Sequence, residues 1–344
     1  MNLNYLIRKN IKAMRPYSSA RDEFKDLKAD MVFLDANENP IETDLNRYPD
    51  PQQTALKELI SKQKRLAVNQ LLLGNGSDEV LDLIFRAFCE PNQDSILTLP
   101  PTYGMYSVLA QLNSIENIEV CLTSDFKIDV NQVLKQVTPS TKLLFLCSPN
   151  NPSGNVMDVN AVTKLLKGFN GLVIIDEAYI DFTGLESWTQ RLNEFPNLIV
   201  TQTLSKAYGL AGIRLGTCFS SKEIIAVLNK IKPPYNINTL TQNAAIDALQ
   251  TNEVFGQVSL IINERKKLSS ALESCFFVEK VFLSSANFIL IKVDDANKRY
   301  NELIKYGFVV RNRTTQSGCE NCLRISIGTP EENIQLLTLL NKFK

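Results

Sequence analysis

Short apolar runs alternate with helix-like patterns through the first two thirds of the chain. Several of these runs are apolar on both faces, which is typical of strands in a mostly parallel sheet covered by helices. The predicted strands are Ser95–Leu99, Ile118–Leu122, Leu143–Cys147, Leu172–Ile175, Leu198–Thr201 and Leu215–Phe219. The predicted helices between them are Ser77–Phe88, Tyr103–Leu112 and Val159–Leu166. This alternation predicts an α/β layered domain.

The pattern changes from about residue 240 onward. A long helical pattern runs from Leu240 to Leu272. The later elements are strands at Phe288–Val293, Phe308–Arg311 and Leu323–Ile327, a helix at Ala296–Tyr306 and a last helix after Pro330. A chain of 344 residues exceeds the usual size of one hydrophobic core. We therefore predict an N-terminal arm or small-domain segment (1–30), a large domain (31–240) and a smaller α+β domain (241–344).

Composition narrows the choice of partners and compartment. The 37 basic residues balance the 37 acidic residues, so charge favours neither nucleic acid nor an anionic membrane. No apolar run approaches the ~20 residues of a membrane-spanning helix, and the N-terminus lacks the apolar core of a signal peptide. The 7 cysteines, an odd number, lie mostly in apolar stretches, which is typical of a reducing compartment. We expect a cytoplasmic protein.

The chain contains no histidine. This excludes serine–histidine and cysteine–histidine hydrolases, and metal sites with histidine ligands. Any acid–base catalyst must then be a carboxylate, a tyrosine, a cysteine or a lysine. Cys319 and Cys322 form a single CxxC, whereas a zinc site needs a second pair of ligands. We interpret them as incidental thiols near a strand, with a metal or redox role as the alternative.

Polar residues at strand ends are the candidate site, because ligands of open parallel sheets collect at the carboxyl edge. The stretch GNGSDEV from Gly74 enters a helix with Ser77 as the predicted N-cap, which makes either a phosphate site or an ordinary cap. Asn151 in SPNNPSG follows a strand, where a plain turn is the simpler interpretation. Asp176 follows four apolar residues, where a carboxylate is unfavourable unless it is paired. Considered alone, Lys206 is most simply interpreted as a solvated surface lysine.

Together these residues match the needs of one cofactor. Arg311 and Arg324 lie at or in strands of the smaller domain, which would face the same edge. A lysine amine bonds covalently to an aldehyde, and a phosphate site suggests that a phosphorylated cofactor carries that aldehyde. A buried carboxylate such as Asp176 keeps a pyridine nitrogen protonated, so that the ring accepts electrons. These are the requirements of pyridoxal 5'-phosphate.

Six motifs, in order, extend this interpretation to a family. They are GSDE, PTYG, NNPSG, DEAY, SKAYGLAGIR and CLRIS. In these motifs the chain resembles the fold-type-I pyridoxal-phosphate-dependent aminotransferases and, within them, the histidinol-phosphate aminotransferases. The resemblance extends from Arg15 to Gly328. It implies a large domain with a mostly parallel seven-stranded sheet flanked by helices, plus a smaller α+β domain.

The resemblance also implies roles around the cofactor. Lys206 would bond covalently to the cofactor and later carry a proton, and Asp176 would pair with the ring nitrogen. Tyr103 would stack on the face of the ring. Asn151 and Tyr179 would hydrogen-bond the phenolate oxygen, which places Tyr179 among the catalytic residues. The phosphate would be held by Gly76, Ser77, Asp78, Ser205 and Arg214.

Further residues would complete the site. Tyr48 matches a tyrosine that reaches the cofactor phosphate of the neighbouring subunit, which implies a homodimer. Arg324 matches the arginine that binds the distal anion of the substrate, and Arg311 matches a second phosphate-binding arginine. The insertion-like stretch TTQSGCEN brings Arg313 nearby, so the sequence leaves open whether Arg311 or Arg313 is the second ligand. Tyrosines on the imidazole side would be Tyr17 and Tyr235.

The reaction implied by the resemblance is amino transfer in L-histidine biosynthesis, between glutamate or 2-oxoglutarate and histidinol phosphate or imidazole-acetol phosphate. Two arginines suit the greater charge of a phosphate. Three alternatives stay open: a threonine-phosphate decarboxylase, an aromatic or branched-chain aminotransferase, and a regulatory protein of this fold without turnover. The last usually carries a DNA-binding domain, for which the chain shows neither a spare segment nor a basic patch.

Overall fold

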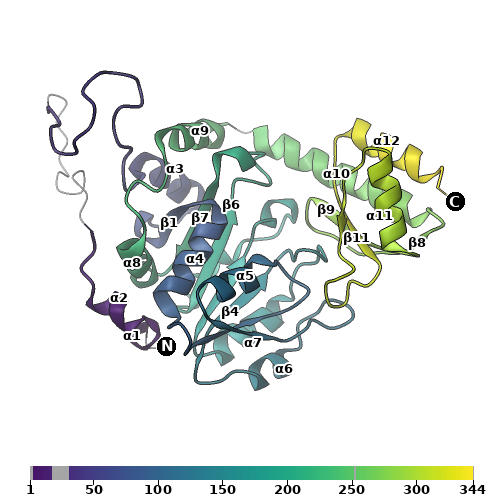
Figure 1. The fold of residues 1–344 in the computed structure, drawn as a ribbon, viewed down its shortest axis with the longest axis horizontal. Helices are drawn as coiled ribbons and strands as arrows, with labels where there is room; N and C mark the ends of the chain where they lie inside the picture. The colour runs from purple at the N-terminus through teal and green to yellow at the C-terminus, as the bar shows by residue number, and fades with distance from the viewer. Residues whose placement is uncertain (1–2, 18–30, 252, 344) are drawn as a thin grey trace.

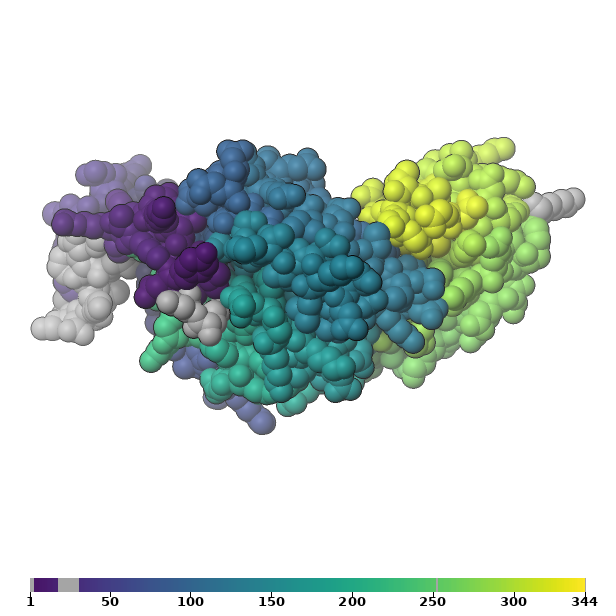
Figure 2. Space-filling view, turned by 90° about the horizontal axis from the view of Figure 1, so that it is seen from below, coloured from purple at the N-terminus to yellow at the C-terminus, as the bar shows by residue number. Residues whose placement is uncertain are grey.

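The computed structural model describes residues 3–17, 31–251 and 253–343. Two domains lie along the longest axis of the molecule and are joined by a long helix (Figure 1, Figure 2). The large domain holds a 7-stranded sheet in the order β1-β7-β6-β5-β4-β2-β3. Its strands are β1 (Leu71–Asn75), β2 (Ser95–Thr98), β3 (Glu116–Glu119), β4 (Thr141–Cys147), β5 (Leu172–Asp176), β6 (Leu198–Thr203) and β7 (Leu215–Ser220). Strands β2 to β6 run parallel, and β7 is antiparallel to both of its neighbours.

Helices cover both faces of this sheet (Figure 1). They are α3 (Thr54–Lys64), α4 (Gly76–Phe88), α5 (Met105–Leu112), α6 (Val130–Lys135), α7 (Val159–Gly168), α8 (Lys222–Ile231) and α9 (Thr239–Gln250). Alternate side chains of a central strand enter two separate hydrophobic cores. In β5, Val173 and Ile175 belong to one core, and Leu172 and Ile174 belong to the other. Burial on both faces explains the continuous apolar runs, and the α/β prediction is confirmed.

The smaller domain packs helices against a 4-stranded antiparallel sheet in the order β10-β11-β9-β8. Its strands are β8 (Val278–Val281), β9 (Phe288–Val293), β10 (Arg311–Asn312) and β11 (Cys322–Ser326). Its helices are α10 (Glu253–Glu273), α11 (Ala296–Lys305) and α12 (Pro330–Leu340). A capping box between Thr329 and Glu332 starts α12. The predicted α+β character of this part is confirmed.

Some predicted elements differ from the structure. The helical pattern Leu240–Leu272 is divided between α9 and α10, because Thr251 takes an extended conformation that ends α9. The strand predicted at Phe308–Arg311 forms a ladder only over β10, because the Phe308 N–H first closes the turn after α11 by donating to the Leu303 carbonyl. Strand β3 begins before the predicted Ile118.

Two observed strands have no predicted counterpart. Strand β1 has an apolar run of only Leu71, Leu72 and Leu73 before Gly74, too short to stand out from the chain around it. Strand β8 has the sequence VEKV, in which charged residues interrupt the apolar pattern. Both strands are recognisable only by their ladders with β7 and β9.

Residues 3–17 lie against the large domain. They form α1 (Leu3–Leu6) and α2 (Lys9–Ala13). The Arg8 N–H donates to the Ala87 carbonyl over 3.0 Å, and Lys230 Nζ donates to the Ile11 carbonyl. The rest of the predicted N-terminal segment, from 18 to 30, lies outside the described residues. In the described part of the chain, none of the helices has the length and apolar character needed to cross a membrane.

Candidate active site

A cavity of about 530 Å³ opens where the two domains meet. It is lined by most of the residues that the sequence singled out, namely Ser77, Asp78, Tyr103, Asn151, Asp176, Tyr179, Ser205, Lys206, Arg214, Arg311, Arg313 and Arg324. We call the lining residues from Ser77 to Arg214 the large-domain wall. The small-domain wall comprises Arg311, Arg313, Gln316 and Arg324.

Strand ends position the large-domain wall. Asp176 is the last residue of β5, level with Cys147 of β4 and Thr201 of β6. Lys206 follows shortly after the end of β6. Because the carboxyl ends of parallel strands meet at one edge of a sheet, the structure brings the carboxylate and the amine into the same cavity, as the sequence pattern predicts.

Asp176 is a buried carboxylate with fixed donors. Its Oδ2 accepts a hydrogen bond from the Tyr106 hydroxyl over 2.9 Å, and its Oδ1 accepts one from the Ala178 N–H over 3.2 Å. Burial raises the pKa of Asp176, and the hydrogen bonds from Tyr106 and Ala178 oppose that rise. A desolvated carboxylate held in one orientation is a strong partner for a protonated ring nitrogen.

Lys206 turns its amine into the cavity. The Nζ atom lies 5.9 Å from the centre of the Tyr179 ring. The surrounding protein atoms lower the pKa of Lys206 by burial, the guanidinium of Arg324 lowers it further, and the charge of Asp176 opposes this effect. A lowered pKa increases the share of neutral amine, which is the nucleophilic form.

The start of α4 is a candidate anion site, which comprises Gly76, Ser77, Asp78 and Arg214. The N–H groups in the first turn of a helix have no partner inside the helix and favour a negative charge. Gly76 has a φ of +77°, and a Cβ on it would come within 2.5 Å of Arg214 Nη2. The missing side chain therefore leaves room for the guanidinium over the helix start. This donor set fits the phosphate group of pyridoxal phosphate.

Ser77 is not the N-cap that the sequence predicts. The helix begins at Gly76 with Asn75 in the N-cap position, because the left-handed backbone of Gly76 turns the chain directly into the first turn. Ser77 therefore lies within that turn and lines the cavity. Beside it, Asp78 accepts a hydrogen bond from the Tyr103 hydroxyl over 3.0 Å and lies 3.8 Å from Arg214.

Asn151 joins the two walls. Its Nδ2 lies 3.5 Å from the Tyr179 hydroxyl, and its Oδ1 accepts a hydrogen bond from Arg324 Nη1. The Tyr179 ring packs edge-on against Phe288 of β9. Burial raises the pKa of Tyr179, which keeps its hydroxyl protonated and able to donate. Asn151 and Tyr179 thus present two donors in the part of the cavity between Asp176 and the small domain.

The small-domain wall is a cluster of guanidinium groups. Arg311 and Arg324 are directly opposite one another in β10 and β11. The Cζ atom of Arg324 lies over the Phe288 ring, 5.2 Å from the ring centre. Burial, then the charges of Arg324 and Arg311, lower the pKa of Arg313 to about 10. The side chains of this wall therefore suit an anionic ligand.

Comparison with known proteins decides the family. The profile of Aminotransferase class I and II matches residues 22–340. The histidinol-phosphate aminotransferase of Flavobacterium psychrophilum is 60% identical over 339 residues, which are 98% of this chain and 98% of that protein. The chain belongs to the histidinol-phosphate aminotransferase family.

Solved structures share the fold of this chain. The crystal structure of the histidinol-phosphate aminotransferase from Clostridium acetobutylicum has a TM-score of 0.80 and 26% identity, over 86% of this chain and 90% of that chain. The histidinol-phosphate aminotransferase from Sinorhizobium meliloti, solved in complex with pyridoxal-5'-phosphate, has a TM-score of 0.79 and 23% identity, over 87% and 84%. The predicted family and fold are confirmed.

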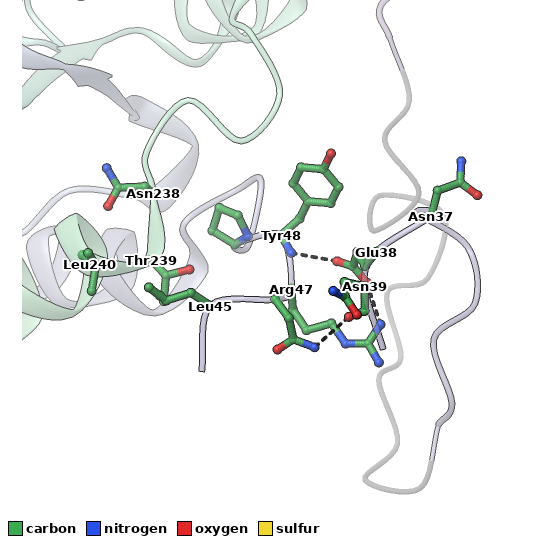
Figure 3. A pocket seen from close by; sticks show the side chains of 11 residues that line it. Asn37, Glu38, Asn39, Leu45, Arg47, Tyr48, Asn238, Thr239 and Leu240 are labelled. Atoms are coloured by element: carbon green, nitrogen blue, oxygen red, sulfur yellow. Dashed lines mark hydrogen bonds and ion pairs between the residues drawn. The ribbon is translucent and has the colours of Figure 1, made fainter. Parts of the chain in front are cut away.

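Three tyrosines that the family resemblance assigns to the site lie elsewhere in the single chain. Tyr48 and Tyr235 stack with their ring centres 4.6 Å apart. Tyr48 lines a second cavity of about 520 Å³, where Glu38 accepts hydrogen bonds from the Tyr48 N–H over 2.7 Å and from Arg47 over 2.8 Å (Figure 3). Tyr17 is 72% exposed. None of the three is among the residues that line the cavity between the domains.

Sequence reasoning missed Tyr106 and Gln316. Tyr106 is fully buried one helical turn after Tyr103, where its position on α5 suggests a core aromatic rather than a donor to Asp176. Gln316 lies in the irregular stretch between β10 and β11 and lines the cavity. No local sequence pattern predicts that position.

Cys319 and Cys322 are buried, free thiols. Over residues 3–17, 31–251 and 253–343, no group of three or more histidine, cysteine, aspartate and glutamate side chains is placed to hold a metal ion. The interpretation of Cys319 and Cys322 as incidental thiols stays a prediction.

Proposed function

We propose that the chain is a pyridoxal-phosphate-dependent aminotransferase of L-histidine biosynthesis. It transfers an amino group between glutamate or 2-oxoglutarate and histidinol phosphate or imidazole-acetol phosphate. The observation that carries the proposal is the meeting of Lys206, Asp176 and an arginine cluster in one cavity. The identity to the Flavobacterium psychrophilum protein favours this reaction over the decarboxylase, the aromatic or branched-chain aminotransferase and the regulatory protein.

The large-domain wall would hold the cofactor. Pyridoxal phosphate supplies an electron sink for the carbon that bears the amino group. Asp176, fixed by Tyr106, would keep the ring nitrogen protonated, and Asn151 and Tyr179 would donate to the ring oxygen. The anion site at the start of α4, with Ser205, would bind the phosphate. These contacts orient the ring in the cavity.

Lys206 would both anchor the cofactor and move the proton. Its lowered pKa makes the amine a ready nucleophile for the aldehyde. Nζ of Lys206, as the free amine, would take the proton from the substrate carbon that bears the amino group and would later return it to the reacting molecule. Lys206 lines the same cavity as Asp176, so the amine is placed near the proposed cofactor site.

The small-domain wall would bind the substrate tail. Arginine forms paired, charge-assisted hydrogen bonds with phosphate and carboxylate groups. Arg324 is held by Asn151 and Phe288, so its guanidinium is oriented before any substrate arrives. We assign it to both tails, the phosphate of histidinol phosphate and the side-chain carboxylate of glutamate.

The site would be completed by a second copy of the chain. The segment of Tyr48 lies at the end of the large domain farthest from the small domain (Figure 1). Exposed apolar side chains gather on and beside this segment, and Val32, Leu34, Ile41, Leu45 and Leu240 are 54% to 88% exposed. A homodimer would cover these side chains and bring the stacked pair Tyr48 and Tyr235 to the partner's cavity. The free cysteines support a reducing, cytoplasmic location within the same proposal.

A half-reaction tests the proposed function. Purified enzyme loaded with pyridoxal phosphate is mixed with histidinol phosphate, glutamate, phenylalanine or threonine phosphate, and the absorbance of the lysine-bound cofactor is followed. We expect rapid loss with histidinol phosphate and glutamate and little with the other two. Rapid reaction with threonine phosphate accompanied by release of carbon dioxide would identify the decarboxylase instead.

A further inference from the structure

Three cations share one face of the small sheet. Arg311 and Arg324 are directly opposite in β10 and β11, and the Arg313 N–H continues the ladder to the Cys322 carbonyl over 2.8 Å. Side chains two apart on a strand point to the same face, and all three line the cavity. Like charges directly opposite in a sheet are destabilising. The cluster therefore favours binding of a counter-charge.

The protein supplies little of that counter-charge itself. Among the residues that the structure describes, no ion pair includes one of these three arginines. The Nε atoms of Arg313 and Arg324 are buried and lack a hydrogen-bond partner in the same part of the chain. Buried donors without an acceptor are rare in folded proteins. Because these Nε atoms are shielded by protein atoms, the donors that a ligand in the cavity can reach are the terminal nitrogens of the three arginines that line it.

Arg311 and Arg313 are placed differently within this cluster. Arg311 is exposed on β10, whereas Arg313 is half-buried. The chain after Arg313 forms consecutive turns, with the Gln316 N–H donating to the Arg313 carbonyl over 2.8 Å and the Cys319 N–H donating to the Gln316 carbonyl over 3.0 Å. These turns hold the base of the Arg313 side chain beside the cavity. Arg324 is already engaged by Asn151, so Arg313 has the larger share of its donors left for a ligand.

We propose that Arg313 is the specificity-determining residue for a dianionic substrate tail. It binds the phosphate together with Arg324, while Arg311 stays at the mouth of the cavity and contributes less. The proposal rests on the proposed function, because it names which residue selects the phosphorylated substrate. A carboxylate carries one charge and is satisfied by Arg324, whereas a phosphate dianion offers more acceptor oxygens and neutralises a second guanidinium.

The main experiment compares Arg313→Gln with Arg311→Gln in enzyme loaded with cofactor. Single-turnover kcat/KM is measured separately for histidinol phosphate and for glutamate. We expect Arg313→Gln to lose about ten- to a hundredfold with histidinol phosphate and to change little with glutamate. Arg311→Gln should lose less with histidinol phosphate than Arg313→Gln. Lys305→Gln, an exposed lysine at the end of α11, is the matched control for loss of a cation.

A second readout does not depend on turnover. The thermal midpoint of cofactor-loaded enzyme is measured with and without inorganic phosphate, since the bound cofactor already occupies the anion site at α4. Phosphate should raise the midpoint of the wild type and of Lys305→Gln more than that of Arg313→Gln. Without phosphate, Arg313→Gln should melt no lower than the wild type, because a repulsive charge has been removed.

The outcomes separate this inference from the proposed function. Unchanged rates with histidinol phosphate and unchanged stabilisation by phosphate in Arg313→Gln would overturn the role of Arg313 while the aminotransferase proposal stands. A greater loss in Arg311→Gln than in Arg313→Gln would overturn it too. If the wild type does not react with histidinol phosphate, the proposed function fails, and the substrate-selecting role of Arg313 falls with it. The phosphate melting data then still show whether Arg313 binds a dianion.

Discussion

The two walls of the cavity between the domains differ in the charges of their side chains. In the large-domain wall, Asp176 is bonded by Tyr106 and Asp78 by Tyr103, and both signs of charge are present. In the small-domain wall, all the charged side chains are cations, and none of them forms an ion pair with an acidic side chain among the described residues. A balanced wall suits a group that stays bound. An unbalanced wall suits an anion that arrives and leaves with each half-reaction.

The walls also differ in what supports them. In the large-domain wall, Asp176 ends β5 and Lys206 follows β6, two central strands that are buried on both faces. In the small-domain wall, Arg311 lies on β10, a strand of 2 residues at one edge of the small sheet, Arg313 follows that strand, and Arg324 lies on β11 beside it. Short edge elements are held by fewer contacts and adapt more readily. This difference fits a fixed cofactor and two substrates of unequal length in the same site.

Removing the Lys206 amine from the large-domain wall should cause the largest loss of activity. Lys206→Ala loses the covalent attachment and the proton carrier together, so multiple turnover should fall by several orders of magnitude. The absorbance of the lysine-bound cofactor should be absent, while cofactor binding through the anion site persists. Spectra and turnover are compared with Lys222→Ala, an exposed lysine of α8. Full turnover in Lys206→Ala would end the pyridoxal-phosphate interpretation.

Neutralising the carboxylate should have the next largest effect. Asp176→Asn keeps the shape and loses the charge that protonates the ring nitrogen, so both half-reactions should slow by about a hundred- to a thousandfold. Cofactor affinity, measured by titration of the apoenzyme, should change far less. Asp82→Asn, on the outer part of α4, is the control. Wild-type rates in Asp176→Asn would show that the carboxylate is only structural.

Within the small-domain wall, Arg324 should matter to both substrates. Arg324→Gln should cost roughly ten- to a hundredfold in kcat/KM with histidinol phosphate and with glutamate, because both tails are assigned to this guanidinium. The two half-reactions are measured separately, alongside cofactor affinity. A loss with one substrate only would mean that the tails use different arginines.

Removing the hydrogen bond from Tyr106 to Asp176 should have the smallest effect on the rate. It should also change how the rate depends on pH. Tyr106→Phe removes a hydrogen bond that holds the pKa of Asp176 down, so that pKa should rise. Since the ionised carboxylate is the active form, the acid limb of the half-reaction rate should move to higher pH, with a loss of about three- to tenfold at its optimum. Tyr5→Phe, an exposed tyrosine, should leave the profile unchanged. An acid limb that stays in place would disconnect Tyr106 from the site.

The sequence identifies the charged residues of both walls, but residue patterns explain only those of the large-domain wall. Asp176 and Lys206 follow apolar strands, and parallel topology alone brings such positions to one edge. The N-cap predicted at Ser77 is wrong by two residues, because the left-handed turn at Gly76 starts the helix there and leaves Asn75 in the N-cap position. Tyr106 is masked by its resemblance to an ordinary core aromatic. The local periodicity of a sequence does not predict burial or hydrogen bonds between elements that are distant in the chain.

The small-domain wall depends on features that only the folded chain reveals. Strand β10 is too short for a pattern, and the turns that direct Arg313 inward follow from backbone hydrogen bonds in an irregular stretch. The family resemblance assigns Tyr48 and Tyr235 to the site, but a single chain places them together and outside the cavity. They would reach a cavity only in the proposed homodimer.

The most direct test of the two-wall account compares histidinol phosphate with histidinol, which lacks the phosphate. Single-turnover rates are measured with the wild-type enzyme loaded with cofactor. Because two charge-assisted contacts of about 1.5–3 kcal/mol each are lost with the phosphate, the account predicts a preference of roughly a hundred- to ten-thousandfold for histidinol phosphate. Equal rates with the two amines would contradict the account, because the small-domain wall would then not distinguish a phosphorylated substrate from one without phosphate.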